Sequence, residues 1–150
     1  MKKILIYGYG NPGRQDDGLG IFLTDKLESW IKQSNIDYVD VDSNYQLNIE
    51  DAYNINEYQV VIFVDASKEN LDDFKFESIS PVEKPRFTMH SVSPEYVIGL
   101  CEQLFGYFPK TYLMHIKGFE WEFMKEPTAR AKDNLEKAYQ YLVQKIQELN

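Results

Sequence analysis

The sequence predicts an α/β protein: three layers, with a mostly parallel, twisted sheet of about five strands that carries helices on both faces, a phosphorylase/hydrolase-like arrangement. Apolar runs of strand length alternate along the chain with segments whose apolar residues recur at helical spacing. Strands that alternate with helices favour parallel pairing, because each return to the same sheet edge needs a crossover. The 150 residues, 43% of them hydrophobic, suffice for one core, so we expect a single domain over 1–150.

The N-terminal half predicts three strands and two helices. Residues 4–7 read as a strand buried on both faces, and a loop over 10–15 follows. A helix is expected from Asp16 or Asp17 onward, with both carboxylates in its first turn, where the helix dipole favours them. The next elements are an alternating strand at 37–42, a weak helix at 47–53 and the most apolar strand, QVVIFVD, at 59–65.

The C-terminal half begins with a charged segment, 67–87, in which we expect a loop or an irregular edge strand. Ser93-Pro94-Glu95 is an N-cap followed by proline at the first helical position, and Gly106 is the expected end of that helix. A strand at 110–117 and a long terminal helix at 128–149 complete the alternation.

Composition narrows the function classes. The net charge of −8 with scattered basic residues argues against a nucleic-acid partner, which normally meets a basic patch. No apolar run approaches the roughly 20 residues of a membrane-spanning helix, so no membrane association is expected. The single cysteine, Cys101, has no internal disulfide partner, which favours a reducing compartment and a cytoplasmic location.

Candidate site residues follow from where ligands bind in open α/β sheets, at the carboxyl ends of the strands. Asp16 and Asp17 follow the first strand, Asp65 ends the central strand and His90 precedes the third helix. Two carboxylates and an imidazole would make a three-ligand site for a divalent transition metal. The structural alternatives are a dipole or cap role for the first two acids and a turn-capping role for Asp65.

A second interpretation concerns Gly8 to Gly13, which match the G-x-G-x-x-G dinucleotide fingerprint, with Asp40 near the expected ribose-binding position. A pyrophosphate needs free backbone N–H groups at a positive helix end. Asp16 and Asp17 would repel it there, and Pro12 lacks an N–H group. The fingerprint is therefore weak support for a nucleotide site.

The remaining reactive residues have simpler explanations. His115 lies in the strand-like run TYLMHIK, where a hydrogen-bonded or solvent-facing histidine is the more common case. Cys101 falls on the apolar stripe of its helix, which indicates a core position. The aromatic cluster at 119–123 leaves open an exposed binding edge.

The motif Gly10-Asn11-Pro12-Gly13-Arg14-Gln15-Asp16-Asp17-Gly18-Leu19-Gly20 resembles that of the nickel–iron hydrogenase maturation proteases and departs from their pattern at Gly13. Further similar segments cover most of the chain to about residue 125: 45–50, the strand 61–66, His90-Ser91-Val92-Ser93-Pro94-Glu95, 105–109 and 116–118. The family's Leu-Ser-Pro before the last helix is replaced by Glu126-Pro127-Thr128.

The resemblance implies an endopeptidase that trims a C-terminal peptide from the nickel-loaded precursor of a hydrogenase large subunit. Carried over onto this chain, the family's metal-binding and catalytic residues are Asp17, Asp65 and His90, with Gly10, Asn11, Asp16 and Gly18 in the supporting loop. Nickel arrives with the substrate, and another divalent transition metal is the alternative occupant. We expect metal-assisted hydrolysis of the aspartic type, which activates the hydrogenase.

Two alternatives stay open. A non-catalytic metal-binding or scaffold protein would keep the fold without the cutting activity. The run Gly8-Tyr9-Gly10-Asn11-Pro12-Gly13 also resembles the peptidyl-tRNA hydrolases. Those enzymes follow the turn with a catalytic histidine and a basic surface, whereas the next histidine here is His90 and the net charge is −8.

Overall fold

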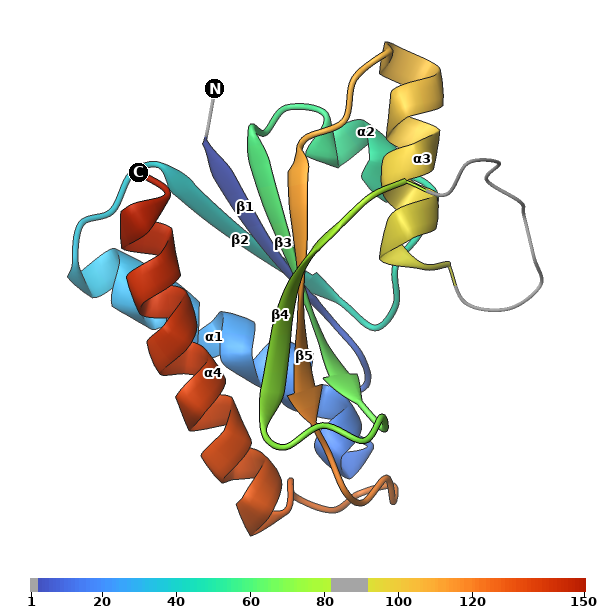
Figure 1. Ribbon diagram of the computed structural model, residues 1–150. Coiled ribbons are helices and arrows are strands. Elements are labelled where there is room, and N and C mark those ends of the chain that lie inside the picture. Colours follow the sequence, from blue (N-terminus) through green and yellow to red (C-terminus); the bar gives the residue numbers. More distant parts are fainter. Residues whose placement is uncertain (1–2, 82–91) are drawn as a thin grey trace.

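The computed structural model contains a five-stranded sheet at the centre of the molecule (Figure 1) and describes residues 3–81 and 92–150. Its strands are β1 (Ile4–Tyr9), β2 (Val39–Asn44), β3 (Val60–Ser67), β4 (Phe74–Ile79) and β5 (Lys110–Lys117). The strand order is β2-β1-β3-β5-β4. All neighbouring pairs are parallel except β4 with β5.

Helices cover both faces of the sheet, so the predicted three-layer α/β fold is confirmed (Figure 1). The helices are α1 (Leu19–Gln33), α2 (Asp51–Ile55), α3 (Pro94–Phe105) and α4 (Ala129–Glu148). Helices α1 and α4 pack on one face, and α2 and α3 on the other. A short 3₁₀ turn, η1 (Gln15–Gly18), precedes α1.

Alternating side chains of the central strands fill two cores. On β1, Ile4 and Ile6 face α1 and α4, whereas Leu5 and Tyr7 face α2 and α3. Such strands are apolar on both faces because helices cover both sides of a parallel sheet. This burial fixes the register of the sheet, since a slip by one residue would exchange the two faces.

Several boundaries differ from the predicted ones, and three of these differences bear on the architecture. The charged segment after β3 contains a regular edge strand, β4, in which Phe74 and Phe76 pack against the core under α1 and α4 and Ile79 belongs to the core under α2 and α3. The weak helix starts at Asp51 rather than at 47. The first helix starts at Leu19, since Gln15 has a positive φ of 52° and the two aspartates lie in η1. Both predicted ends of α3 are confirmed: Ser93 Oγ accepts from Tyr96 N, and Gly106 has a φ of 70°.

Within 3–81 and 92–150, none of the helices combines the length and the apolar character needed to cross a lipid bilayer.

A fully buried carboxylate, that of Asp16, joins the loop after β1 to the loop after β5. Its Oδ2 accepts from the backbone N–H groups of Phe119 at 2.7 Å and Glu120 at 3.1 Å. Thr128 donates to the same carboxylate twice, from its backbone N–H at 2.8 Å and from its hydroxyl at 2.9 Å. The Thr128 hydroxyl also accepts from Ala131 N as the N-cap of α4. Asp16 therefore positions η1, the loop after β5 and the start of α4 relative to one another.

Replacement of Asp16 by asparagine is expected to lower the free energy of unfolding by about 3 kcal/mol, because an amide nitrogen would face buried donors that now share two carboxylate oxygens. Urea denaturation measures the change. The matched control is Asp133→Asn, an exposed acid on α4, which should have almost no effect. An equal decrease in the free energy of unfolding in the two variants would contradict a structural role for Asp16.

Candidate functional site

The candidate site lies at the point where the strand order of the sheet reverses, between β1 and β3. β1 and β3 are neighbours at the centre; from β1 the chain crosses to β2 on one side, and β3 lies on the other. Ligands of open α/β sheets bind at such a switch point, beyond the carboxyl ends of the strands. Asp17, in η1 after β1, and Asp65, near the end of β3, both lie at this point. The structure thus brings together two acids that are far apart in the sequence.

The loop after β1 holds Asp17 through the backbone. Its Oδ2 accepts from Asn11 N at 3.0 Å, and the Asn11 side chain accepts in turn from Gly13 N at 2.9 Å. Gly10 has a φ of 136°, and a Cβ there would lie 2.2 Å from the Asp17 carbonyl oxygen and 3.9 Å from Asp65 Oδ1. Only glycine fits this conformation and this close approach. The loop backbone therefore passes against both acids.

The two carboxylates repel each other. Burial, and then the charge of Asp17, raise the pKa of Asp65 to about 7, although hydrogen bonds from the Ala66 backbone and the Tyr9 side chain partly oppose the rise. A carboxyl group with this pKa exchanges its proton near neutral pH. That property suits general acid–base chemistry, and it indicates that no neutralising cation lies beside the pair among residues 3–81 and 92–150.

Tyr9 is a site residue that the sequence analysis missed. Burial, followed by the charges of Asp65 and Glu95, raises its pKa far above the ordinary value, so the hydroxyl stays protonated and donates to Asp65. Its ring meets Phe63 edge-on, with centroids 6.5 Å apart. The spacing of Tyr7 and Tyr9 was the available signal. In a strand that continues through Gly8, residues two apart lie on the same face, so both tyrosines lie on one side of the sheet.

The third predicted ligand, His90, lies outside the described residues. Within 3–81 and 92–150, no group of three histidine, cysteine, aspartate or glutamate side chains could hold a metal ion. Asp17 and Asp65 supply carboxylate oxygens that lie close to each other, a donor set that suits a divalent cation. The three-ligand site with His90 stays a prediction.

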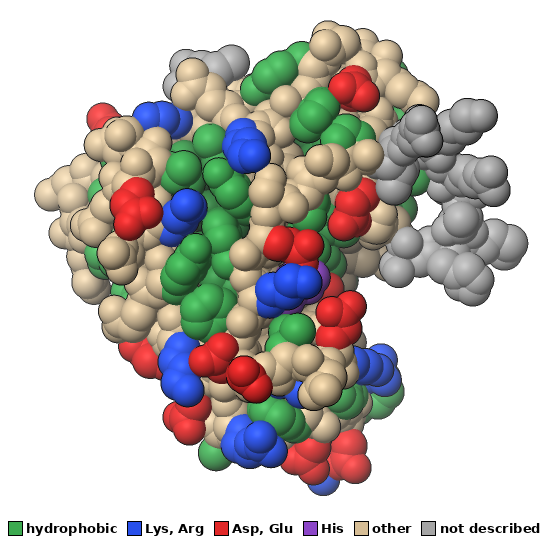
Figure 2. Space-filling view, in the orientation of Figure 1, with side chains coloured by type: hydrophobic (Ala, Val, Ile, Leu, Met, Phe, Trp, Pro, Cys, Tyr) green, Lys and Arg blue, Asp and Glu red, His purple; other side chains and the backbone are tan. Residues whose placement is uncertain are grey.

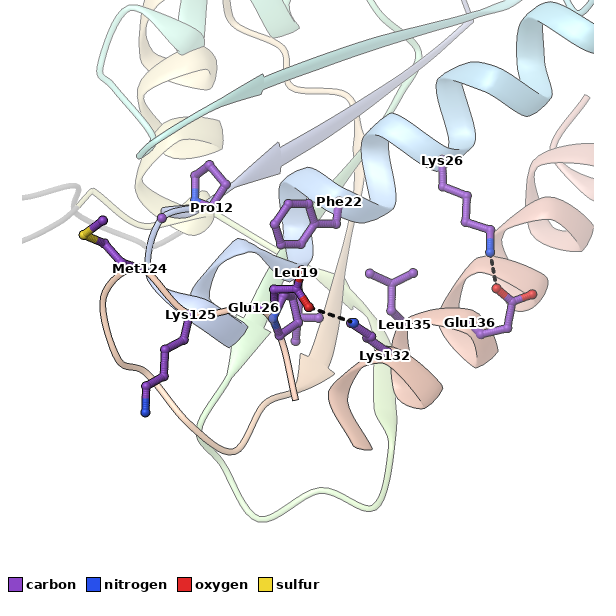
Figure 3. A pocket seen from close by; sticks show the side chains of 12 residues that line it. Pro12, Leu19, Phe22, Lys26, Met124, Lys125, Glu126, Lys132, Leu135 and Glu136 are labelled. Atoms are coloured by element: carbon purple, nitrogen blue, oxygen red, sulfur yellow. Dashed lines mark hydrogen bonds and ion pairs between the residues drawn. The ribbon is translucent and has the colours of Figure 1, made fainter. Parts of the chain in front are cut away.

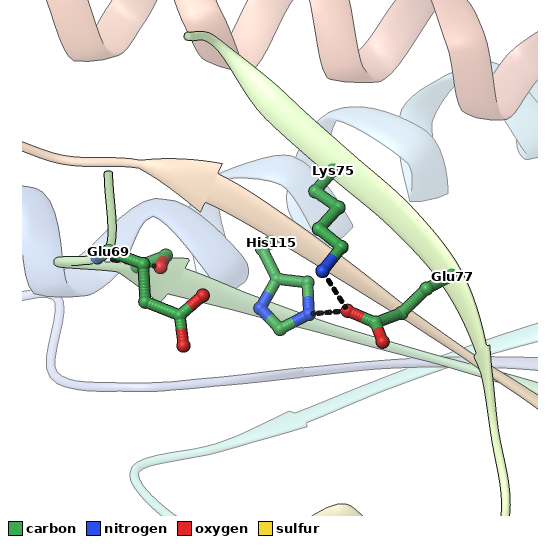
Figure 4. Close-up of polar contacts among 5 residues, drawn as sticks. Glu69, Lys75, Glu77 and His115 are labelled. Carbon is green, nitrogen blue, oxygen red and sulfur yellow. Dashed lines mark hydrogen bonds and ion pairs between the residues drawn. The ribbon is translucent and has the colours of Figure 1, made fainter. Parts of the chain in front are cut away.

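His115 has protein partners, as expected. Its Nε2 lies 2.8 Å from Glu77 Oε2, and Lys75 Nζ lies 3.2 Å from the same oxygen (Figure 4). Desolvation raises the pKa of Glu77, but hydrogen bonds and positive charge from Lys75 and His115 outweigh it and lower that pKa below the ordinary value. His115 is also the register partner of Asp65 on the neighbouring strand.

Cys101 belongs to the core, as its place on the helix indicated. It is fully buried, and its thiol donates to the Tyr107 carbonyl at 3.3 Å. Burial raises the pKa of the thiol to about 11, which leaves it unreactive at neutral pH.

The structure argues against a dinucleotide site, because backbone N–H groups of the glycine-rich loop already donate to protein side chains. The N–H groups of Asn11 and Gly13, which a phosphate would need, bind the Asp17 and Asn11 side chains instead. Asp40, the candidate ribose ligand, accepts a hydrogen bond of 2.7 Å from the Tyr58 hydroxyl. On the face seen in Figure 2, acidic and basic side chains are interspersed, without the broad basic patch that nucleic acid favours.

The raised pKa of Asp65 predicts a pH-dependent stability. From its ordinary value of 3.8 to about 7, the folded protein keeps a proton that the unfolded chain has released, so this group lowers stability as the pH rises through that window. The side chain of Asp65→Asn cannot ionise. From pH 4.5 to pH 7.5, the free energy of unfolding of this variant should therefore rise on the order of 2 kcal/mol relative to that of wild type. Urea denaturation at both pH values measures the difference. Asp72→Asn, an exposed acid in the loop after β3, is the control; a difference that stays constant with pH for Asp65→Asn would rule out the shift.

Comparison with known proteins gives no matching family model and no matching curated protein. Solved structures do match. The [NiFe] hydrogenase maturation protease HycI from Thermococcus kodakarensis superposes with a TM-score of 0.75 at 19% identity, over 95% of this chain and 91% of that one. The hydrogenase maturating endopeptidase HybD from Escherichia coli superposes with a TM-score of 0.72 at 20% identity, over 97% of this chain and 93% of that one.

A third match is the hydrogenase 2 maturation peptidase from a Thaumarchaeota archaeon, with a TM-score of 0.70 at 21% identity, over 97% of this chain and 98% of that one. Each of these similarities extends over nearly the whole of both chains. The chain therefore has the fold of the solved hydrogenase maturation proteases, in agreement with the resemblance that its first loop indicates.

Proposed function

We propose that this protein is an endopeptidase that removes a C-terminal peptide from the nickel-loaded precursor of a nickel–iron hydrogenase large subunit. The observation that carries the proposal is the carboxylate pair Asp17 and Asp65, in which the pKa of Asp65 is raised to about 7. The pair lies at the switch point of a sheet whose fold matches structures named as hydrogenase maturation proteases.

In this proposal nickel is part of the substrate. A cation that approaches the pair removes the repulsion between the two carboxylates, so the precursor binds through its metal. His90 is the third protein ligand that the resemblance implies. The remaining metal positions are left for the substrate and for water, and the metal polarises the scissile carbonyl or activates the attacking water.

The protein's own residues orient this reaction. The Asn11 N–H group holds Asp17, and the Tyr9 hydroxyl holds Asp65, so each carboxylate keeps one oxygen directed by the protein. A carboxyl group that exchanges its proton near neutral pH accepts a proton from the attacking water and returns it to the leaving amine. This cycle is the aspartic-type chemistry that we assign to Asp65.

A non-catalytic metal-binding or scaffold protein is the second candidate. It would hold the metal of the precursor through the same two carboxylates, Asp17 and Asp65, without hydrolysis. Such a protein would bind the precursor without shortening it. A peptidyl-tRNA hydrolase-like enzyme is disfavoured by the net charge of −8 and by the acid pair, since both repel a tRNA backbone.

Asp17→Asn is expected to slow trimming of a nickel-loaded large-subunit precursor on the order of 100-fold or more, because the variant loses a charged metal ligand and keeps its size. Intact-mass spectrometry of the precursor with time measures the rate. Asp65→Asn and His90→Gln should behave alike, whereas Asp72→Asn, an exposed acid in the loop after β3, should keep the wild-type rate.

Undiminished trimming by Asp17→Asn would exclude the proposed role of the pair. A precursor that co-purifies with the wild-type protein but is never shortened would select the scaffold alternative.

A further inference from the structure

His115 and Asp65 lie on the same face of the sheet, the face that α2 and α3 cover. Phe63 on β3 and Leu113 on β5 belong to the core under these helices. Because side chains alternate along a strand, Asp65 and His115, two positions further on, point to the same side. They are register partners on neighbouring parallel strands, which lie about 4.8 Å apart. His115 is therefore one strand away from the acid at the centre of the candidate site.

A groove of about 760 Å³ between α1 and α4 lies on the opposite face of the sheet (Figure 3). Two of its lysines, Lys26 and Lys132, form ion pairs with glutamates of the same groove. Neither Asp17 nor Asp65 lines it. Residues that contact a substrate held at the acid pair are therefore expected on the face that carries Asp65, where His115 lies.

Glu77 fixes the orientation of the His115 ring. Its Oε2 lies 2.8 Å from His115 Nε2, and Lys75 Nζ lies 3.2 Å from the same oxygen (Figure 4). The pKa of Glu77 lies below its ordinary value, so at neutral pH the carboxylate is ionised and can only accept a hydrogen bond. The hydrogen in this bond therefore belongs to Nε2 of His115. With 17% of its side chain exposed, the ring has little freedom to turn away from Glu77.

The same contact leaves Nδ1 of His115 as a hydrogen-bond acceptor. A neutral imidazole carries a hydrogen on one ring nitrogen and a lone pair on the other. Nδ1 lies on the side of the ring away from Glu77 (Figure 4), and no residue among 3–81 and 92–150 donates to it. A carboxylate that holds one ring nitrogen and leaves the other as an acceptor is the arrangement by which hydrolases orient a histidine. His115 therefore offers an oriented acceptor beside Asp65.

We propose that His115 is a substrate-binding residue of the candidate site, whose Nδ1 accepts a hydrogen bond from a backbone N–H group of the substrate next to the bond that is cut. The inference rests on the proposed function and adds to it a contact for the peptide itself, apart from the metal. Residues of an extended chain repeat about every 3.4 Å, so an acceptor about 4.8 Å from Asp65 reaches an N–H group within about two residues of the cut. Such a contact positions the chain without reading its side chains, because every residue except proline carries this donor.

Two substitutions separate this role from a purely structural one. The side-chain amide of His115→Gln can place its nitrogen at the position of Nε2 and keep the bond to Glu77, but it leaves no acceptor at the position of Nδ1. The amide of His115→Asn places its oxygen near the position of Nδ1 and loses the bond to Glu77. A contact with the substrate predicts slower trimming by His115→Gln, whereas a purely structural contact predicts slower trimming by His115→Asn.

In the trimming assay we expect His115→Gln to lower kcat/KM about tenfold, because one hydrogen bond to the substrate is lost. His115→Asn should stay within about threefold of wild type. Urea denaturation should rank the two variants in the opposite order, since only His115→Gln keeps the bond to Glu77. Lys75→Gln is the matched control: Lys75 contacts the same Glu77 oxygen, so this variant disturbs Glu77 without removing Nδ1 and should keep the wild-type kcat/KM.

Long-range proton–nitrogen NMR of the free protein tests the ring geometry without a substrate. Nε2 is expected to carry the hydrogen, and a hydrogen on Nδ1 instead would overturn the inference. Trimming that is as fast in His115→Gln as in His115→Asn, or faster, would also overturn it and would leave the proposed function intact. Binding of the nickel-loaded precursor without trimming, measured by surface plasmon resonance and weakened more by His115→Gln than by His115→Asn, would overturn the function and leave this contact intact. A wild-type protein that neither binds nor trims the precursor would overturn both.

Discussion

The buried carboxylate of Asp16 is the interaction on which the site depends. It gathers donors from the loop after β5 and from the N-cap of α4, and holds them against the turn that carries Asp17. A buried charge is stable only when hydrogen bonds replace the water it has lost, and here four of them do so. The two adjacent aspartates therefore have opposite roles. Asp16 is fully satisfied by the protein, whereas Asp17 faces another acid.

The carboxylates of Asp17 and Asp65, unlike that of Asp16, interact unfavourably with each other. Burial and mutual repulsion raise the pKa of Asp65, and Tyr9 only partly opposes them. Active sites commonly hold groups in an environment that is unfavourable until a ligand arrives. A rigid turn that brings two carboxylates together, without a cation among the described neighbours, is consistent with a site that is completed by the metal of its substrate.

Much of this fold could be predicted from the sequence because both cores are local patterns: continuous apolar strands alternate with amphipathic helices. That Asp17 and Asp65 lie close together was also predictable, since Asp17 follows one apolar strand and Asp65 lies near the end of its neighbour. The role of Asp16 was not, because its partners Phe119, Glu120 and Thr128 are more than 100 residues away and all three donate through the backbone. Tyr9 was missed because Gly8 looked like the end of a strand that in fact continues. His90 lies outside the described residues, so its place at the site stays a prediction.

The site depends on Asp17 and Asp65 being held so close together that the charge of one raises the pKa of the other. The most direct test of this proximity is a pH titration of the Asp65 carboxyl carbon by NMR, in wild type and in Asp17→Asn. We expect a pKa near 7 in wild type and a lower value in the variant, because a neutral amide removes the repulsion that Asp17 exerts. A wild-type pKa near the ordinary value of 3.8, or a raised value that Asp17→Asn leaves unchanged, would contradict it.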